Sequence, residues 1–163
     1  TGFIGSALRR AFAGRRDIMN LVGANTVKHG GTYNGNPICA AAALHTLRMI
    51  AEDETRRAID GVGDVLIETI NRAASDNGIE CIVQGLGSMF QVVFGTKTPL
   101  RHYRDVLKTD QKRYAAFRHE LLKQGIHANS SGLACWFVSG AHTQDDVEIT
   151  TAAIESAMKV IAS

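Results

Sequence analysis

The segment from His29 to Pro37 carries residue types that could hold an anion. It reads His-Gly-Gly-Thr-Tyr-Asn-Gly-Asn-Pro and continues as Ile-Cys-Ala-Ala-Ala-Ala-Leu, which predicts a helix. Asn36 can cap that helix, and Pro37 suits its first position because its missing N–H would have no partner there. The glycines allow sharp turns or close approach by a ligand. Amides, a threonine hydroxyl and a close backbone suit a phosphate group, although the same residues also suit an ordinary loop.

Five segments, in order along the chain, resemble class III aminotransferases, which use pyridoxal 5'-phosphate (PLP). The resemblance is strongest to the glutamate-1-semialdehyde aminomutase branch, and it covers nearly the whole chain. The segments are Phe12–Met19, the His29–Pro37 loop, Gly87–Phe90, Gly125–His127, and Trp136–Ser139 with Ala141–Asp146. The resemblance implies amino-group transfer with a small-molecule amino acid as substrate, and it indicates the C-terminal portion of a PLP-dependent enzyme.

The resemblance also implies which residues bind the cofactor. Thr32 would donate its hydroxyl to the PLP phosphate, and Gly31 would allow close backbone approach. In this family the contact comes from the neighbouring subunit, which implies a homodimer. His29 is interpreted as a residue that orients the loop. At Ala134 the aminomutase branch usually carries a glutamate, so the resemblance leaves aminomutase and intermolecular transaminase both open.

No catalytic residue is predicted in this chain. The family's Schiff-base lysine lies a fixed distance before the Ala11-Phe12 segment, and counting back places it at Thr1. Threonine has no amine and cannot form that bond. The chain alone is therefore expected to be inactive, and a complementing chain that carries the lysine could restore activity.

Composition narrows the possible partners. The 163 residues are 45% hydrophobic and 21% charged, with a net charge of +2. No basic run alternates with aromatics, so nucleic acid is not expected. We find no membrane-length apolar run and no signal peptide. Three widely spaced cysteines suit a reducing cytoplasm, with Cys39 and Cys135 interpreted as buried small residues. The six histidines show no metal-ligand spacing.

The elements expected around these residues give an α+β fold with a small antiparallel sheet covered by helices. Periodicity and end signals predict four helices: 15–22, 37–51, one through residues 59–73 that ends at Asn77-Gly78, and 111–123. Strands are expected at 79–84, 88–94, 125–127 and 135–139. Alternation places Phe90, Val92 and Phe94 on one face of the strand at 88–94, and Trp136 and Phe137 are expected in the core. Thr143 and Asp146 form a near capping box for the last helix. That architecture matches the C-terminal part of fold type I (aspartate aminotransferase-like) PLP enzymes, with 1–50 as the tail of the large PLP-binding domain plus an inter-domain helix and 51–163 as the small domain.

Two other functions remain open. A lone C-terminal portion would expose apolar surface, so the chain could be a non-catalytic interaction module. Thr1–Leu8 also resembles the phosphate-binding turn of extended short-chain dehydrogenases, which bind NAD. Against the second alternative, no Tyr-x-x-x-Lys pair follows in the chain.

Overall fold

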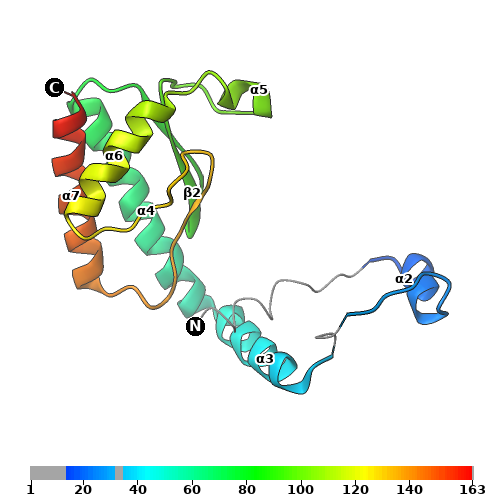
Figure 1. Cartoon of the computed structure of the whole chain (residues 1–163). Coiled ribbons are helices and arrows are strands. Elements are labelled where there is room, and N and C mark those ends of the chain that lie inside the picture. Colours follow the sequence, from blue (N-terminus) through cyan, green and yellow to red (C-terminus); the bar gives the residue numbers. More distant parts are fainter. Residues whose placement is uncertain (1–13, 32–34, 163) are drawn as a thin grey trace. The chain divides into compact units, whose positions relative to one another are not determined.

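The computed structural model describes residues 14–31 and 35–162. The chain divides into two compact units, Thr1–Asp53 (the first unit) and Glu54–Ser163 (the second unit). Figure 1 shows the elements of both.

In its described part, the first unit contains two helices that have no buried residues. They are α2 (Arg16–Gly23) and α3 (Pro37–Ala51), and neither contains a buried residue. The predicted helices at 15–22 and 37–51 are confirmed. On α3 the exposed side chains include Ile38, Leu47 and Met49, with Ile38 76% exposed. A helix this apolar is ordinarily stabilised by packing, so its surface is unusual for a free helix.

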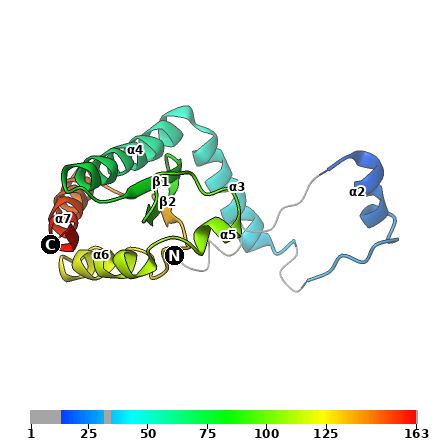
Figure 2. The same cartoon turned by 90° about the horizontal axis from the view of Figure 1, so that it is seen from above.

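The second unit has the predicted α+β architecture. Its elements in chain order are α4 (Asp53–Asp76), β1 (Cys81–Leu86), β2 (Met89–Phe94), α5 (Tyr103–Val106), α6 (Gln111–Lys123), β3 (Trp136–Phe137) and α7 (Gln144–Ala162). The strands form one antiparallel sheet in the order β1-β2-β3. In Figures 1 and 2, α4, α6 and α7 surround the inner side of this sheet.

The core follows from strand alternation in β2. Successive side chains of a strand point to opposite faces, and Phe90, Val92 and Phe94 are all at most 1% exposed. They pack against buried residues of the three long helices, chiefly Leu66, Ile70, Phe117, Leu121, Ile154 and Met158. The predicted face of this strand is therefore confirmed.

The helix ends confirm two predicted signals. After α4, Gly78 has a φ of +65° and the Ile79 amide donates to the Ala74 carbonyl at 2.8 Å, which closes the C-terminal turn. Before α7, the Thr143 amide donates to Asp146 Oδ2 at 2.8 Å and the Asp146 amide donates to Thr143 Oγ1 at 3.3 Å. The capping box is thus reciprocal.

Three strand predictions were wrong in detail. Residues 125–127 form no strand, because Gly125 (φ +82°) and Ile126 donate to Leu122 and Leu121 carbonyls and so complete the end of α6. β1 begins at Cys81 rather than residue 79, because Ile79 is used in the turn after α4. The strand expected at 135–139 shrinks to β3.

Some predicted core residues are exposed or only half-buried. Trp136 is buried, but Phe137 is 71% exposed, because adjacent strand residues face opposite sides and only Trp136 faces the core. Cys39, Cys81 and Cys135 are free thiols of intermediate exposure rather than fully buried. Burial still raises the pKa of the Cys81 thiol to about 12.

Two glycines allow α4 to contact the turn between β1 and β2. A Cβ on Gly63 of α4 would overlap the carbonyl group of Gly87. Next to this contact, Asp60 Oδ1 accepts from the Ser88 amide at 3.2 Å. The missing side chain at position 63 therefore sets the distance between helix and hairpin.

We expect Gly63→Ala to destabilise the second unit by about 1–3 kcal/mol, because backbone atoms cannot move aside as a flexible side chain can. The matched control is Gly61→Ala on the same helix, where no atom lies within 4 Å of the added Cβ. Gly61→Ala should stabilise the second unit by up to about 1 kcal/mol, because alanine has a higher helix propensity than glycine. Urea unfolding followed by fluorescence of Trp136, the only tryptophan, measures both. Equal effects of the two variants would contradict the contact.

The Thr143–Asp146 box also predicts a pH dependence. Hydrogen bonds from the amide and hydroxyl of Thr143 lower the pKa of Asp146 below its ordinary 3.8. A carboxyl with a depressed folded pKa stabilises above its unfolded pKa and loses that contribution as pH falls through the folded value. Asp146→Asn should therefore flatten the loss of stability below about pH 4. Asp145→Asn removes the same charge from the same turn but leaves the capping hydrogen bonds in place. This control should leave the loss of stability below about pH 4 unchanged.

Candidate functional site

The loop before α3 holds the predicted cofactor contacts, and the structure describes part of it. Gly31 is exposed, and a Cβ placed on its neighbour Gly30 would meet no atom within 4 Å. Thr32 lies outside the described residues. The described side of the loop, at Gly30 and Gly31, is thus open to solvent.

The first turn of α3 limits which groups could donate to an anion. Asn36 Oδ1 accepts from the amides of Ile38 at 3.0 Å and Cys39 at 3.1 Å. The Ala40 amide donates to the Asn36 carbonyl at 2.9 Å, and Pro37 has no N–H. Every amide of the first turn is therefore occupied or absent. An anion at this loop would have to be held by the loop's own amides and by the threonine hydroxyl, not by the helix terminus.

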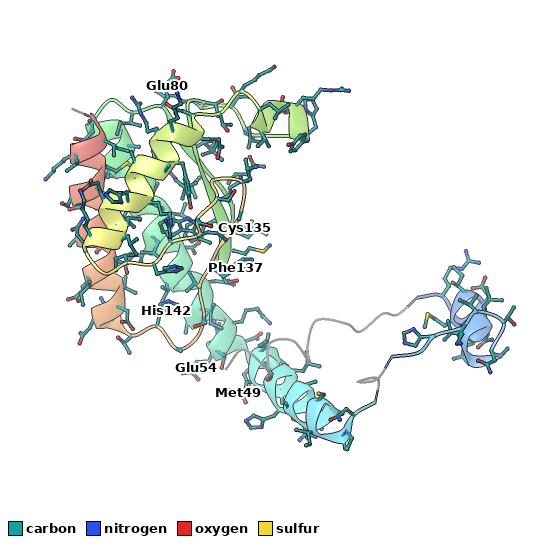
Figure 3. The ribbon with its side chains drawn as sticks, viewed as in Figure 1. Met49, Glu54, Glu80, Cys135, Phe137 and His142 are labelled. Carbon is teal, nitrogen blue, oxygen red and sulfur yellow. The ribbon has the colours of Figure 1, made fainter. Side chains whose placement is uncertain are left out.

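The histidines are not brought together as a metal site. Within residues 14–31 and 35–162, no group of three or more His, Cys, Asp or Glu could hold a metal ion. His29 is exposed. His142 lies on the segment that leads into α7 (Figure 3), where its Nδ1 is 3.0 Å from the Ser139 carbonyl oxygen. The contacts shown by His142 are those of a residue that stabilises a turn.

Other predicted site features fall outside the described residues or show only structural contacts. The lysine position at Thr1 and the dinucleotide-type turn at Thr1–Leu8 both lie outside the described part. Ala134 is half-buried, and its amide donates to the Ser131 carbonyl at 3.1 Å. Cys135 and Phe137 lie at the sheet in Figure 3.

The second unit contains two cavities that the sequence patterns did not indicate. One, of about 670 Å³, lies between the end of α6, β3 and the start of α7. Its wall includes Leu66, Trp136 and Ile149, together with His127 and His142. The other, of about 550 Å³, is formed by the segment 95–109 between β2 and α6.

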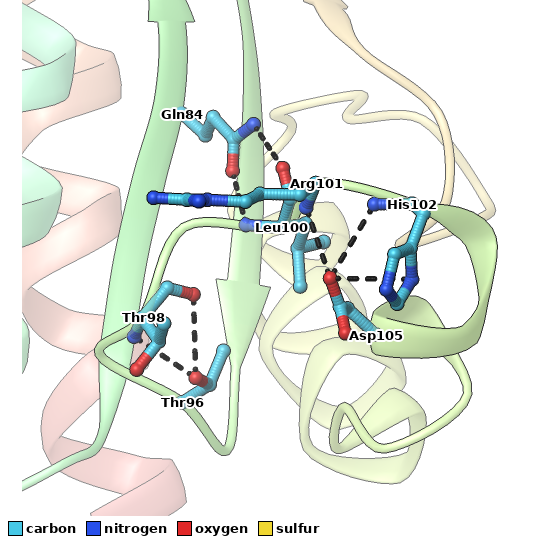
Figure 4. Close-up of polar contacts among 7 residues, drawn as sticks. All are labelled: Gln84, Thr96, Thr98, Leu100, Arg101, His102 and Asp105. Carbon is cyan, nitrogen blue, oxygen red and sulfur yellow. Dashed lines mark hydrogen bonds and ion pairs between the residues drawn. The ribbon is translucent and has the colours of Figure 1, made fainter.

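Side chains fasten the 95–109 segment to the sheet (Figure 4). Gln84 of β1 donates from Nε2 to the Leu100 carbonyl at 2.9 Å and accepts at Oε1 from the Leu100 amide at 2.8 Å. One glutamine side chain thus pairs with both backbone groups of one residue, as a neighbouring strand would. An isolated glutamine within a strand gives no sequence signal for such a contact.

Among the described helices, none is both long and apolar enough to cross a membrane.

Comparison with known sequences identifies the family. The model of the family described as aminotransferase class-III matches residues 4–161. Glutamate-1-semialdehyde 2,1-aminomutase of Methanopyrus kandleri is 36% identical over 149 residues, which cover 91% of this chain and 34% of the relative. The protein of the same name from Desulfatibacillum aliphaticivorans is 31% identical over 150 residues, covering 91% and 35%. The chain thus spans about a third of the length of these relatives.

Solved structures share the fold. An omega-transaminase from Sphaerobacter thermophilus superposes with a TM-score of 0.78 at 23% identity, covering 92% of this chain and 35% of its own. A beta-phenylalanine aminotransferase from Variovorax paradoxus gives 0.74 at 27% identity, covering 88% and 33%. The predicted fold, the C-terminal part of a PLP-dependent transferase, is confirmed, and this chain belongs to the class-III aminotransferase family.

Proposed function

We propose that this chain serves PLP-dependent amino-group transfer of the glutamate-1-semialdehyde aminomutase type, on a small-molecule amino acid. The supporting observation is the family match over residues 4–161, together with four relatives at 30–36% identity that carry the aminomutase name. Position 134 is Ala, whereas that branch usually has a glutamate there. Intermolecular transamination is therefore the alternative reaction. Three free cysteines are in keeping with a reducing cytoplasmic location.

The part of this chain in that reaction would be to hold the cofactor. PLP supplies the electron sink that makes amino-group chemistry possible. Thr32 would donate its hydroxyl to the phosphate, and Gly31 would let the backbone come close. The Asn36 cap fixes the start of α3, immediately after this loop, and so limits the positions that the loop can take. None of these residues would move a proton.

The partner would be a second subunit, because the family's phosphate contact crosses between subunits. The exposed apolar side chains of α3 support this proposal, since the first unit gives them no cover. In the same proposal, residues 1–50 are the tail of the large PLP-binding domain plus an inter-domain helix, and 51–163 are the small domain. The division of contacts between Asp53 and Glu54 is in keeping with that boundary.

We further propose that the 163-residue chain is inactive alone, because Thr1 occupies the position counted for the lysine and its side chain offers no amine. The purified chain with PLP should show no aminomutase or transaminase turnover. Mixing it with the lysine-bearing portion of a family member should give activity. Turnover by the chain alone would refute the proposed inactivity.

The mixture also tests the cofactor contact. Thr32→Val removes the hydroxyl while keeping the shape, and we expect PLP affinity to fall about tenfold or more, as for a hydrogen bond to a charged acceptor. Thr32→Ser is the matched control and should keep most of the affinity. PLP retained after desalting, read by absorbance, measures binding apart from activity. Equal retention by wild type and Thr32→Val would contradict the contact.

A non-catalytic interaction module is the second candidate function. The observation that favours it is again the α3 surface, where Leu44, Leu47 and Ile50 are each at least 47% exposed. Binding to the lysine-bearing portion without any gain in activity would favour this candidate over the first.

A further inference from the structure

The cavity of about 550 Å³ in the second unit is built from one continuous segment. Its wall runs from Gly95 at the end of β2, through the turn that contains Pro99, to Thr109 before α6. It includes the cationic residues Arg101 and Lys108. None of these residues belongs to the predicted cofactor contacts at Gly31 and Thr32.

The wall of this cavity is held in place before any ligand arrives. Gln84 fixes Leu100 through both of its backbone groups. In the turn before it, the Thr98 amide donates to Thr96 Oγ1 at 3.0 Å. At the end of the segment, the Asp110 amide donates to the Phe94 carbonyl at 2.8 Å. A wall anchored to the sheet at two places and braced by an internal turn loses little freedom on binding, which favours affinity.

The acidic residue of the cavity is already engaged. Asp105 Oδ2 accepts from the amides of Arg101 at 3.0 Å and His102 at 3.3 Å. The same oxygen lies 3.4 Å from His102 Nδ1. These bonds, with the charge of Lys108 nearby, lower the pKa of Asp105, so the carboxyl is ionised at neutral pH. Its charge is directed at backbone amides and the His102 ring, as Figure 4 shows.

The two cations of the cavity are not engaged in the same way. Within the described part of the chain, neither the Arg101 guanidinium nor the Lys108 ammonium makes a hydrogen bond or ion pair. In the view of Figure 4, the Arg101 side chain extends away from Asp105. The positive charges of Arg101 and Lys108 outnumber the single negative charge of Asp105, so these three side chains leave the cavity net positive.

We propose that this cavity binds a small dianion, either a phosphate group or a dicarboxylate, between Arg101 and Lys108. A guanidinium can bind two oxygens of a planar or tetrahedral anion at once. The ammonium adds a compact second charge, and the hydroxyl-bearing Thr96 and Thr98 lie in the same wall. The site lies entirely in the second unit and does not depend on the proposed amino-group transfer.

The test is a titration of the 163-residue chain, without PLP, followed by amide chemical shifts in NMR spectra. Inorganic phosphate and succinate are the two probes, each at constant ionic strength adjusted with sodium chloride. The variants are Arg101→Gln and Lys108→Gln. Their matched controls are Arg104→Gln, on α5, and Lys97→Gln, in the same turn, and neither residue lines the cavity.

We expect at least one probe to give saturating shifts confined to residues 95–109. Arg101→Gln and Lys108→Gln should each weaken binding about tenfold or more, while the two controls change it by less than about twofold. Saturation by phosphate alone would identify a phosphate-bearing ligand, and saturation by succinate alone would identify a dicarboxylate. Unchanged shifts in β2 and α6 verify that each variant is folded. Absence of saturation with both probes, or equal weakening by the controls, would overturn the proposal.

Discussion

The packing of Phe117, on α6, against aromatic rings of two strands is the contact on which the second unit depends. Its ring lies 5.4 Å from that of Phe94 in β2 and 6.3 Å from that of Trp136 in β3. Tyr114 Oη then accepts from Trp136 Nε1 at 3.1 Å and donates to the Asn129 carbonyl at 2.8 Å. β3 has only two residues, too few to hold themselves in the sheet by backbone bonds. One face of α6 therefore positions the edge of the sheet, and burial raises the pKa of the Tyr114 hydroxyl.

On the outer face of the sheet, side-chain amides of two glutamines, rather than aromatic rings, make the contacts that hold neighbouring loops. Gln84 and Gln91 are paired across β1 and β2. Gln84 holds Leu100, and Gln91 Nε2 donates to the Gly132 carbonyl at 2.8 Å. Each glutamine thus fastens one loop against the sheet. Among the described residues, no buried side-chain nitrogen or oxygen lacks a hydrogen-bond partner.

Sequence signals predicted the parts of the fold that depend on neighbours along the chain. The Asn36 cap, the Thr143–Asp146 box and the alternation in β2 all act over a few residues, and the structure shows each of them. The strand expected at 125–127 did not form because its first residue, Gly125, completes the end of α6, and Ile126 then packs against the core. The contact of Gln84 with Leu100 spans 16 residues and leaves no periodic pattern. At the candidate site, the sequence indicated both an anion-binding loop and the Asn36 cap. It did not indicate that, with this cap in place, no amide in the first turn of α3 is left to donate to an anion.

The two units differ in how many of their apolar side chains they bury with their own elements. In the second unit, apolar side chains such as Ile154 and Met158 are fully buried by its own elements. In the first unit, α3 is more apolar than any of the long helices of the second unit, yet Ile38 and Leu47 remain largely exposed. Burying side chains of this size is worth about 1.5–3 kcal/mol each, so a helix of this composition is stabilised mainly by what covers it. The loop at Gly31 leads directly into that helix, and whatever surface covers α3 therefore also sets the position of the candidate cofactor contact.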